Sequence, residues 1–264
     1  MIVYQSKNIE EIGARIEWAH FTAGEVEEVH AMLHVEPRCE LFEGQMTRIQ
    51  QAEKIFLEME DVQGSSIVFK RYFLSDATNQ VPVIQERDAC TVSYIPSTGI
   101  GGSPYDPKAL VQLDSYAMTG FEPQQQRYLY GLSHLNRTIE YGVTFERATL
   151  MQYGDRNHVF ISGTASINHK GEVMYVGNVQ QQTFRMWENV ETLLNEGGMS
   201  YEDVMQIIVY LRDSADYEMV KGMFDQKFPH IPTVFTLAPV CRPTWLIEME
   251  CIAVKKASND FRDF

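Results

Sequence analysis

Two carboxylates, Glu248 and Glu250, interrupt the largely apolar run Trp245–Ala253 near the end of the chain. If residues 245–254 form a strand, its side chains alternate between faces, so both acids share a face with apolar residues such as Leu246. An unpaired buried carboxylate is costly, so each acid should meet a cation, a hydrogen-bond donor or a water-filled pocket. A sheet edge facing solvent is the alternative. We favour a partly buried site, where a carboxylic acid whose pKa is raised by desolvation could deliver a proton near neutral pH.

Glu248 is the candidate proton donor, and pairing with Arg242 or with a backbone group is its structural alternative. Cys241 and Arg242 lie seven and six residues before it. Arg242 could hold a substrate carboxylate, and a surface ion pair is an equally weighted alternative. Cys241 could line a pocket, although packing is the commoner role of a buried thiol, and no His lies at a spacing that suggests a dyad. Glu250 is expected to be structural.

The bulk composition limits the classes of protein that fit. A chain of 264 residues with 44% hydrophobic residues should fold into one large or two medium globular domains. Its formal net charge of −14 opposes binding to a nucleic acid. The four cysteines are widely spaced, which predicts neither a disulfide framework nor a metal site, and indicates a reducing compartment. We expect no cofactor. Without a signal-like start or a run of about 18 apolar residues, we expect a cytoplasmic protein with no membrane partner.

The two halves of the chain match each other at an offset of 137 residues. Without a gap, the first-half residues Gln45, Arg48, Leu57 and Phe73–Asp76 fall on Gln182, Arg185, Leu194 and Tyr210–Asp213. A slip of one residue then aligns Leu110–Asp114 with Leu246–Glu250. This pattern predicts two copies of one supersecondary unit. The slipped alignment places Gln112 at the position of Glu248, so an acidic proton donor is expected in the second copy alone.

Hydrophobic periodicity and turn residues predict the elements of each copy. In the second copy we expect strands at 159–163, 171–176, 207–211, 233–237 and 245–254, a helix at 180–196 and a second helix from a Ser214 cap to before Pro229. A capping box at Ser200 and Asp203 is also expected. In the first copy we expect a helix at 45–58, a strand at 67–74 and a loop at 96–107. Two helices should cover one face of a sheet.

Several motifs of the second half occur together in the order of a known family. The segments are Ile161–Ile167, Gln182–Thr183, Glu188–Val190, Val209–Asp213 and Ala238–Ala253. Together they resemble the Rid/YjgF superfamily. The resemblance implies an α+β fold of two tandem Rid/YjgF-like (chorismate-mutase-like) domains, each a mixed sheet with two helices on one face. The expected divisions are a divergent N-terminal domain at 1–121, a connecting segment at 122–146 and a C-terminal domain at 147–264. The resemblance also implies a homo-oligomer with sites at domain or subunit interfaces, and an activity that hydrolyses reactive enamines or imines.

One departure from the deaminase pattern affects the expected substrate. Rid deaminases carry an arginine in a Pro-x-Arg segment that clamps the substrate carboxylate, whereas the matching segment here is Pro232–Phe235, with no arginine. Arg242 could serve instead. The motif Gly163–Ser166, with the Cys241–Arg242 pair before a strand glutamate, resembles chorismatases, which hydrolyse the enolpyruvyl ether of chorismate and release pyruvate.

The chorismatase resemblance implies further substrate-binding residues. Residues 141–148 are similar to the stretch that supplies a pocket arginine in chorismatases, so Tyr141 and Arg147 become candidates. A solvent-exposed arginine is the favoured interpretation of Arg147. Gly163 and Thr164 could offer backbone N–H groups to a developing negative charge, and a structural turn glycine is the alternative.

The favoured function is therefore a hydrolase or lyase acting on a small unsaturated carboxylate. Its reaction would be chorismatase-like enol ether cleavage or enamine/imine hydrolysis, with proton transfer from Glu248. A non-catalytic protein of the same fold that binds a small metabolite is the second hypothesis. An endoribonuclease or translation inhibitor is the least favoured, because the acidic charge opposes it.

Overall fold

The computed structural model describes residues 1–38, 40–60, 67–77, 95–102, 104, 106–141 and 145–263. The chain divides into two compact units, a first unit at Met1–Pro123 and a second unit at Gln124–Asp263. This boundary lies inside the predicted connecting segment, 122–146. Among the described residues, no helix combines the length and the apolar character needed to cross a bilayer.

The first unit is a six-stranded mixed sheet that packs against a long helix. Its elements are β1 (Ile2–Ile9), β2 (Ala14–Ala23), β3 (Val26–Val35), α1 (Phe42–Met59), β4 (Ile67–Leu74), β5 (Ser97–Gly101) and β6 (Val111–Thr119). The strands lie in the order β1-β2-β3-β6-β4-β5, and only β4 and β5 are parallel. Apolar residues of α1, such as Met46 and Ile49, share one buried cluster with Leu33 of β3 and Leu113 of β6. The core therefore lies on the face of the sheet that carries Leu113.

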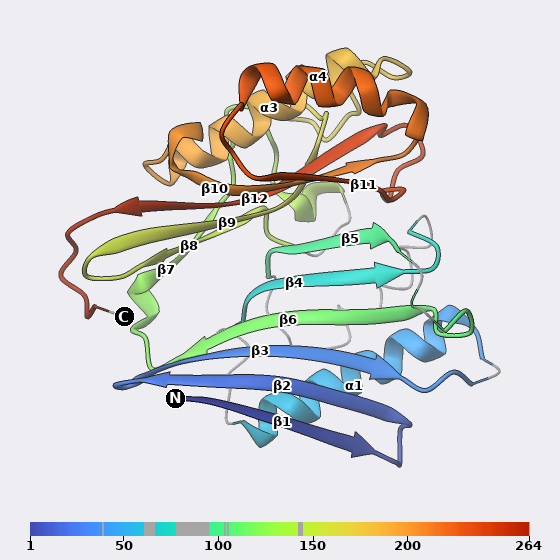
Figure 1. Ribbon diagram of the computed structural model, residues 1–264, viewed down its shortest axis with the longest axis vertical. Helices are drawn as coiled ribbons and strands as arrows, with labels where there is room; N and C mark the ends of the chain where they lie inside the picture. Colours follow the sequence, from blue (N-terminus) through green and yellow to red (C-terminus); the bar gives the residue numbers. More distant parts are fainter. Residues whose placement is uncertain are drawn as a thin grey trace. The chain divides into compact units, whose positions relative to one another are not determined.

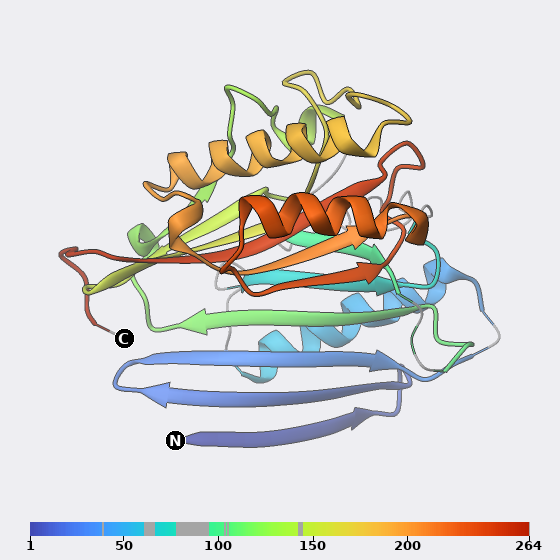
Figure 2. The same cartoon turned by 45° about the horizontal axis from the view of Figure 1, so that its top comes forward.

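The second unit repeats this architecture. Its strands are β7 (Gln126–Leu129), β8 (Ala148–Gln152), β9 (Arg156–Ala165), β10 (Val204–Leu211), β11 (Thr233–Leu237) and β12 (Ile247–Lys256). Its helices are α3 (Val179–Glu196), α4 (Tyr217–Lys227) and the short 3-10 turns η2 (Pro123–Gln125), η3 (Thr138–Tyr141), η4 (Tyr201–Asp203) and η5 (Ser214–Asp216). The order β7-β8-β9-β12-β10-β11 reproduces that of the first sheet strand for strand. In Figures 1 and 2, α3 and α4 lie over the same face of this sheet. The fold is thus the expected pair of Rid/YjgF-like units, with both expected helices described in the second unit and one, α1, among the described residues of the first.

A glutamine on the long helix of each unit confirms the repeat in atomic detail. The Gln45 side chain donates to Lys108 O at 2.8 Å and accepts from Leu110 N at 2.7 Å. In the second unit, Gln182 donates to the carbonyl of Thr244 at 2.9 Å and accepts from the amide of Leu246 at 2.9 Å. These backbone partners are related by the one-residue slip of the sequence alignment. Both amides satisfy the backbone that enters the last strand, so they belong to the shared fold.

One expected strand and one expected loop are wrong. Residues 171–176 form no strand; a single bridge joins Ile167 and Val173. The Asn168 side chain accepts from the amides of Lys170 and Glu172, which turns the chain at that point. Conversely, the expected loop at 96–107 contains β5, whose glycine-rich sequence is recruited by parallel pairing with β4. Tertiary pairing there overrides a weak strand propensity.

The local helix signals are mostly confirmed. The capping box of Ser200 and Asp203 is present. Ser214 does not cap the second helix: it begins the turn η5, which is capped by the side chain of Asp213, and Asp216 is the N-cap residue of α4. Part of the connecting segment, β7, pairs with β8 as an edge strand of the second sheet.

Candidate functional site

Glu248 lies near the start of a central strand. β12 is hydrogen-bonded to β9 on one side and to β10 on the other, and Glu248 stands opposite Ala165 and Tyr210. Alternation places its side chain on the face opposite to Met249, the counterpart of the core residue Leu113. Its side chain points away from the helix-covered face but is only 4% exposed. Glu248 is therefore a buried acid on the face of the sheet that points away from the helices, as the strand pattern predicts.

The surroundings of Glu248 favour its protonated form. Burial, followed by the charge of nearby Glu250, raises the pKa of Glu248 from 4.5 to about 8. The positive charges of Arg147 and Arg212 act in the opposite direction. At neutral pH, most Glu248 side chains therefore carry a proton, as a general acid requires.

Arg147 is one of the residues whose charge acts on Glu248, and it is not the solvent-exposed arginine that we favoured. It precedes β8 directly and is only 3% exposed. Its guanidinium donates to Asn136, from Nε to the backbone carbonyl at 3.1 Å and from Nη2 to Oδ1 at 3.4 Å. A buried arginine held in place near an acid can contribute charge to a carboxylate site.

Cys241 and Arg242 lie in the segment between β11 and β12. Arg242 is partly exposed, donates from Nη1 to Gly171 O at 3.0 Å and stacks its guanidinium carbon 5.0 Å from the Trp245 ring centroid. Burial raises the pKa of the Cys241 thiol to about 12, with a contribution from the charge of Glu248. The thiol is thus un-ionised at neutral pH, which disfavours a nucleophilic role. These electrostatic interactions place Cys241 near both Glu248 and Arg242.

Gly163 and Thr164 lie within β9, not at its end as the sequence suggested. Thr164 pairs with Met249 and Ile161 with Cys251. The two residues of β9 between them, 162 and 163, therefore lie opposite the single residue Glu250 of β12. This is a β-bulge, a feature that often re-aims strands beside active sites. The ladder between β3 and β6 in the first unit has no such shift.

The pairing of Thr164 with Met249 puts its side chain on the helix-covered face. Its hydroxyl donates to Ser162 O at 2.9 Å. The Thr164 side chain therefore lies on the other face from Glu248. Gly163 is a bulge residue and partly exposed.

The remaining candidate, Tyr141, is the last residue of η3, and its side chain lies outside the described residues, as do residues 142–144. The sequence did not single out Arg212, although the repeat held a signal. At the offset of 137 residues Arg212 falls on Ser75, so a charge is present in one copy and absent from the other.

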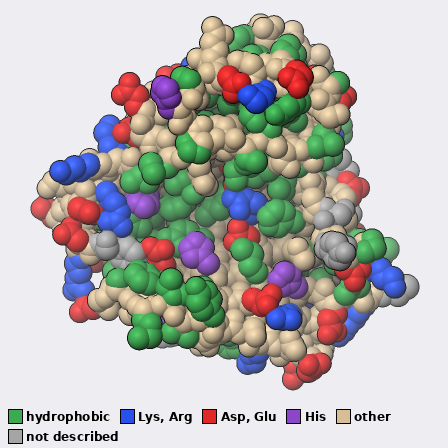
Figure 3. Space-filling model, viewed as in Figure 1, with side chains coloured by type: hydrophobic (Ala, Val, Ile, Leu, Met, Phe, Trp, Pro, Cys, Tyr) green, Lys and Arg blue, Asp and Glu red, His purple; other side chains and the backbone are tan. Residues whose placement is uncertain are grey.

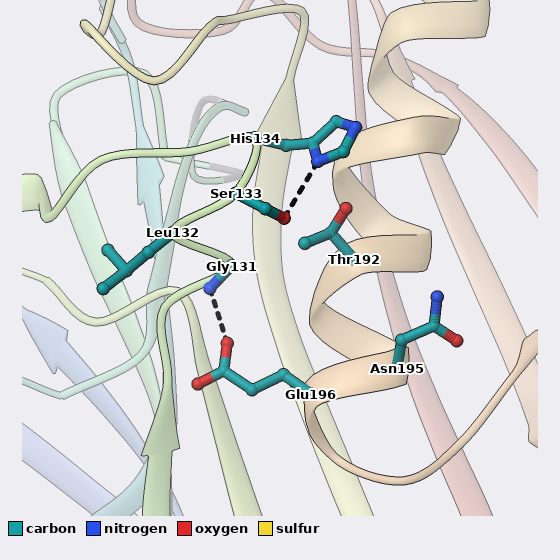
Figure 4. Close-up of a pocket in the computed structure, with 7 residues that line it drawn as sticks. All are labelled: Gly131, Leu132, Ser133, His134, Thr192, Asn195 and Glu196. Atoms are coloured by element: carbon teal, nitrogen blue, oxygen red, sulfur yellow. Dashed lines mark hydrogen bonds between the residues drawn. The ribbon is translucent and has the colours of Figure 1, made fainter.

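A separate pocket of about 530 Å³ lies at the C-terminal end of α3 (Figure 4). Its lining consists of Gly131, Leu132, Ser133, His134, Thr192, Asn195 and Glu196. Ser133 Oγ lies 3.0 Å from His134 Nδ1, and Glu196 accepts from the Gly131 amide at 2.6 Å. The glutamate thus binds the backbone rather than completing a Ser-His-Glu relay. None of the candidate residues around Glu248 lines this pocket.

Metal chemistry has no obvious centre within the described part of the chain. No three His, Cys, Asp or Glu side chains converge there as metal ligands would. Cys241 and Cys251 are both free thiols.

Comparisons with known proteins agree with the architecture. The family model described as Endoribonuclease L-PSP matches residues 148–255. A RutC family protein of Pyrococcus abyssi is 31% identical over 102 residues, which cover 38% of this chain and 80% of that protein. The 3-aminoacrylate deaminase RutC of Acinetobacter baylyi is 29% identical over 99 residues, covering 37% of this chain and 79% of the deaminase.

A solved structure extends the likeness to both units. A chorismatase crystal structure superposes with a TM-score of 0.74 at 16% identity, covering 94% of this chain and 79% of the chorismatase. At that identity the likeness concerns the fold. The first unit is therefore part of a known two-unit architecture, although the family model matches only the second.

Proposed function

We propose that this chain, which belongs to the Rid/YjgF (RutC) family, hydrolyses a small unsaturated carboxylate by proton transfer from Glu248. The observation that carries the proposal is the state of Glu248: a carboxylic acid, 4% exposed, whose pKa of about 8 keeps it protonated at neutral pH. Arg147 and Cys241 interact with it electrostatically, and Arg242 interacts with Cys241.

The chemistry needs one proton donor and one water molecule. Glu248 protonates the terminal or β-carbon of the double bond, which leaves a cation stabilised by the neighbouring nitrogen or ether oxygen. Water adds to the cationic carbon, and its proton returns to the Glu248 carboxylate. The adduct collapses to a carbonyl group and releases ammonia from an enamine or an alcohol from an enol ether. A donor with a pKa near the working pH suits both halves of this cycle.

Arg242 is the proposed partner of the substrate carboxylate, with Arg147 as a second source of positive charge. Arg242 replaces the arginine that Pro232–Phe235 lacks, and it is partly exposed beside Cys241. The name of the Acinetobacter baylyi relative, a 3-aminoacrylate deaminase, supports an enamine carboxylate as one substrate class. A chorismatase-like enol ether is the other class, because it requires the same protonation at carbon.

Nuclease activity, which the family description names, is disfavoured by charge. The net charge of −14 repels a phosphate backbone. On the face drawn in Figure 3, Lys and Arg side chains are scattered among Asp and Glu side chains and form no continuous basic patch.

The test is turnover of three compounds by the wild type and by Glu248→Gln. Pyruvate release is followed from chorismate and from freshly generated 2-aminoacrylate, and ammonia release from 3-aminoacrylate. Glu191→Gln, at an exposed position on α3, is the matched control. We expect the wild type and the control to turn over at least one compound, and Glu248→Gln to lose about 100-fold or more in kcat.

Two outcomes would contradict the proposal. Unchanged turnover in a folded Glu248→Gln variant would remove the glutamate from the mechanism. A wild type that turns over none of the three, yet is stabilised by them in a thermal-shift assay, would be a metabolite-binding protein instead.

A further inference from the structure

The segment between β11 and β12 is bound by the Arg212 side chain in addition to that of Gln182. Arg212, the first residue after β10, donates from Nε to Trp245 O at 2.7 Å and from Nη2 to Val240 O at 2.6 Å and Arg242 O at 2.9 Å. These carbonyls are spread over six residues of a segment that belongs to neither strand. Charge-assisted hydrogen bonds from one planar guanidinium fix such backbone more firmly than neutral bonds would.

The first unit shows that the fold does not need this arginine. The amide of Arg212 donates to Leu246 O at 3.0 Å, and the amide of Ser75 donates to Leu110 O at 2.9 Å. The acceptors are related by the same slip as the glutamine contacts, so Ser75 and Arg212 occupy equivalent positions. The backbone bond is therefore common to both copies, whereas the guanidinium that clamps the second-unit segment comes from a position where the first copy has Ser75.

The clamped segment carries two of the candidate residues. Cys241 lies between two clamped carbonyls, those of Val240 and Arg242, so its position follows from theirs. The Arg242 side chain is oriented by Gly171 O and by the ring of Trp245, whose own carbonyl is the third acceptor of the clamp. Arg212 also acts on Glu248 through space, because its positive charge opposes the rise of the Glu248 pKa.

We infer that Arg212 is a positioning residue of the second-unit site: its guanidinium fixes the segment 240–245 and so sets where Cys241 and Arg242 stand relative to Glu248. The expected effect of Arg212 on activity rests on the proposed function. Its expected effect on the order of the segment rests on the hydrogen bonds alone. Arg212 needs no contact with the substrate to act in this way.

The structural consequence is tested without a substrate. Hydrogen exchange, read by mass spectrometry on the peptide that spans 240–246, is compared among the wild type, Arg212→Met, Arg212→Lys and Arg185→Met. Arg185 is the matched control, since it also donates to backbone carbonyls in this unit, those of Ile167 and His134. We expect faster exchange of the 240–246 peptide in Arg212→Met, a smaller increase in Arg212→Lys and none specific to this peptide in Arg185→Met. Unchanged exchange in a folded Arg212→Met variant would overturn the inference; if that variant does not fold, Arg212→Lys decides.

The catalytic consequence is tested on whichever compound the wild type turns over. We expect kcat/KM to fall about 100-fold in Arg212→Met, the order expected when a reacting group is misplaced by about 1 Å. The basic limb of its pH profile should move to higher pH, because a positive charge near Glu248 is lost. Arg212→Lys keeps the charge, so it should lose activity with the limb unmoved. A loss of activity in Arg212→Met with neither faster exchange nor a moved limb would contradict positioning.

The two experiments fail separately. If the wild type is inactive on all compounds, the proposed function fails while the exchange data still decide whether Arg212 fixes the segment. If turnover depends on Glu248 but is unaffected by Arg212→Met, the proposed function stands and this inference fails.

Discussion

Replacing Glu248 with glutamine should stabilise the protein while it removes the proposed proton donor. Burial, followed by the charge of Glu250, raises the pKa of Glu248 from 4.5 to about 8. Because the folded-state pKa is the higher one, the stability linked to this proton is complete below about pH 4.5 and is lost as the pH rises to about 8. At about 1.4 kcal/mol per pH unit, the loss reaches about 3 kcal/mol at pH 7 and about 4 kcal/mol at pH 8. Glutamine is neutral throughout, so the variant escapes this loss.

The measurement is the free energy of unfolding of the second unit as a function of pH. Urea denaturation is followed by tryptophan fluorescence in a Trp18→Phe background, so that the signal comes from Trp187 and Trp245. The difference between Glu248→Gln and the parent should grow by about 3–4 kcal/mol between about pH 5 and about pH 8. The slope is the informative quantity, because local packing of the new amide shifts all values equally.

A control separates burial from a general effect of charge. Glu191→Gln removes an exposed carboxylate from α3 and should leave the pH dependence of the unfolding free energy as it is in the parent. A difference between Glu248→Gln and the parent that stays flat across this pH range would refute a raised pKa at Glu248. The proposed role as a neutral acid would then lose its basis.

Three further predictions concern the glutamines of the shared fold and the surroundings of Glu248. Gln45→Ala and Gln182→Ala should each lower the free energy of unfolding of their own unit by about 2–4 kcal/mol in urea denaturation, because two backbone groups lose a partner; a loss below about 0.5 kcal/mol would contradict this. Cys241→Ala should keep turnover within about tenfold of the wild type, since a thiol with a pKa of about 12 is un-ionised at neutral pH. Abolished turnover in a folded variant would instead make the thiol a participant. Arg147→Met should move the basic limb of the kcat/KM profile to higher pH, because Arg147 opposes the rise of the Glu248 pKa; a limb at the same or lower pH would count against that coupling.

Much of the fold could be predicted from the sequence because the chain contains two copies of the same unit. The match of Gln45 with Gln182, and the later one-residue slip, correspond to real equivalent contacts with the backbone before the last strand. The helix expected at 180–196 is α3, and the strand expected at 67–74 is β4. Such elements are visible because apolar periodicity and capping residues act over a few neighbouring positions.

Local patterns failed where distant partners decide the conformation. β5 is a strand because β4 lies beside it, in spite of the glycines and serine of its own sequence. Residues 171–176 have a strand-like composition, yet the Asn168 side chain turns the chain there and one bridge to Ile167 remains. Strand formation depends on pairing, which a local window does not contain.

The candidate site likewise has features that local sequence shows and features that depend on distant residues. The sequence by itself determined which side chains are candidates for chemistry: an acid on an apolar strand, with a thiol and a guanidinium shortly before it, and a neutral glutamine at the equivalent position of the first copy. Only the tertiary structure decided that burial raises the pKa of Glu248 to about 8, that Arg147 is buried near it, and that Arg212 clamps the segment 240–245. The physical reason is that pKa values and hydrogen-bond partners are set by burial and by charges a few ångströms away, which here come from residues tens to about a hundred positions apart in the chain.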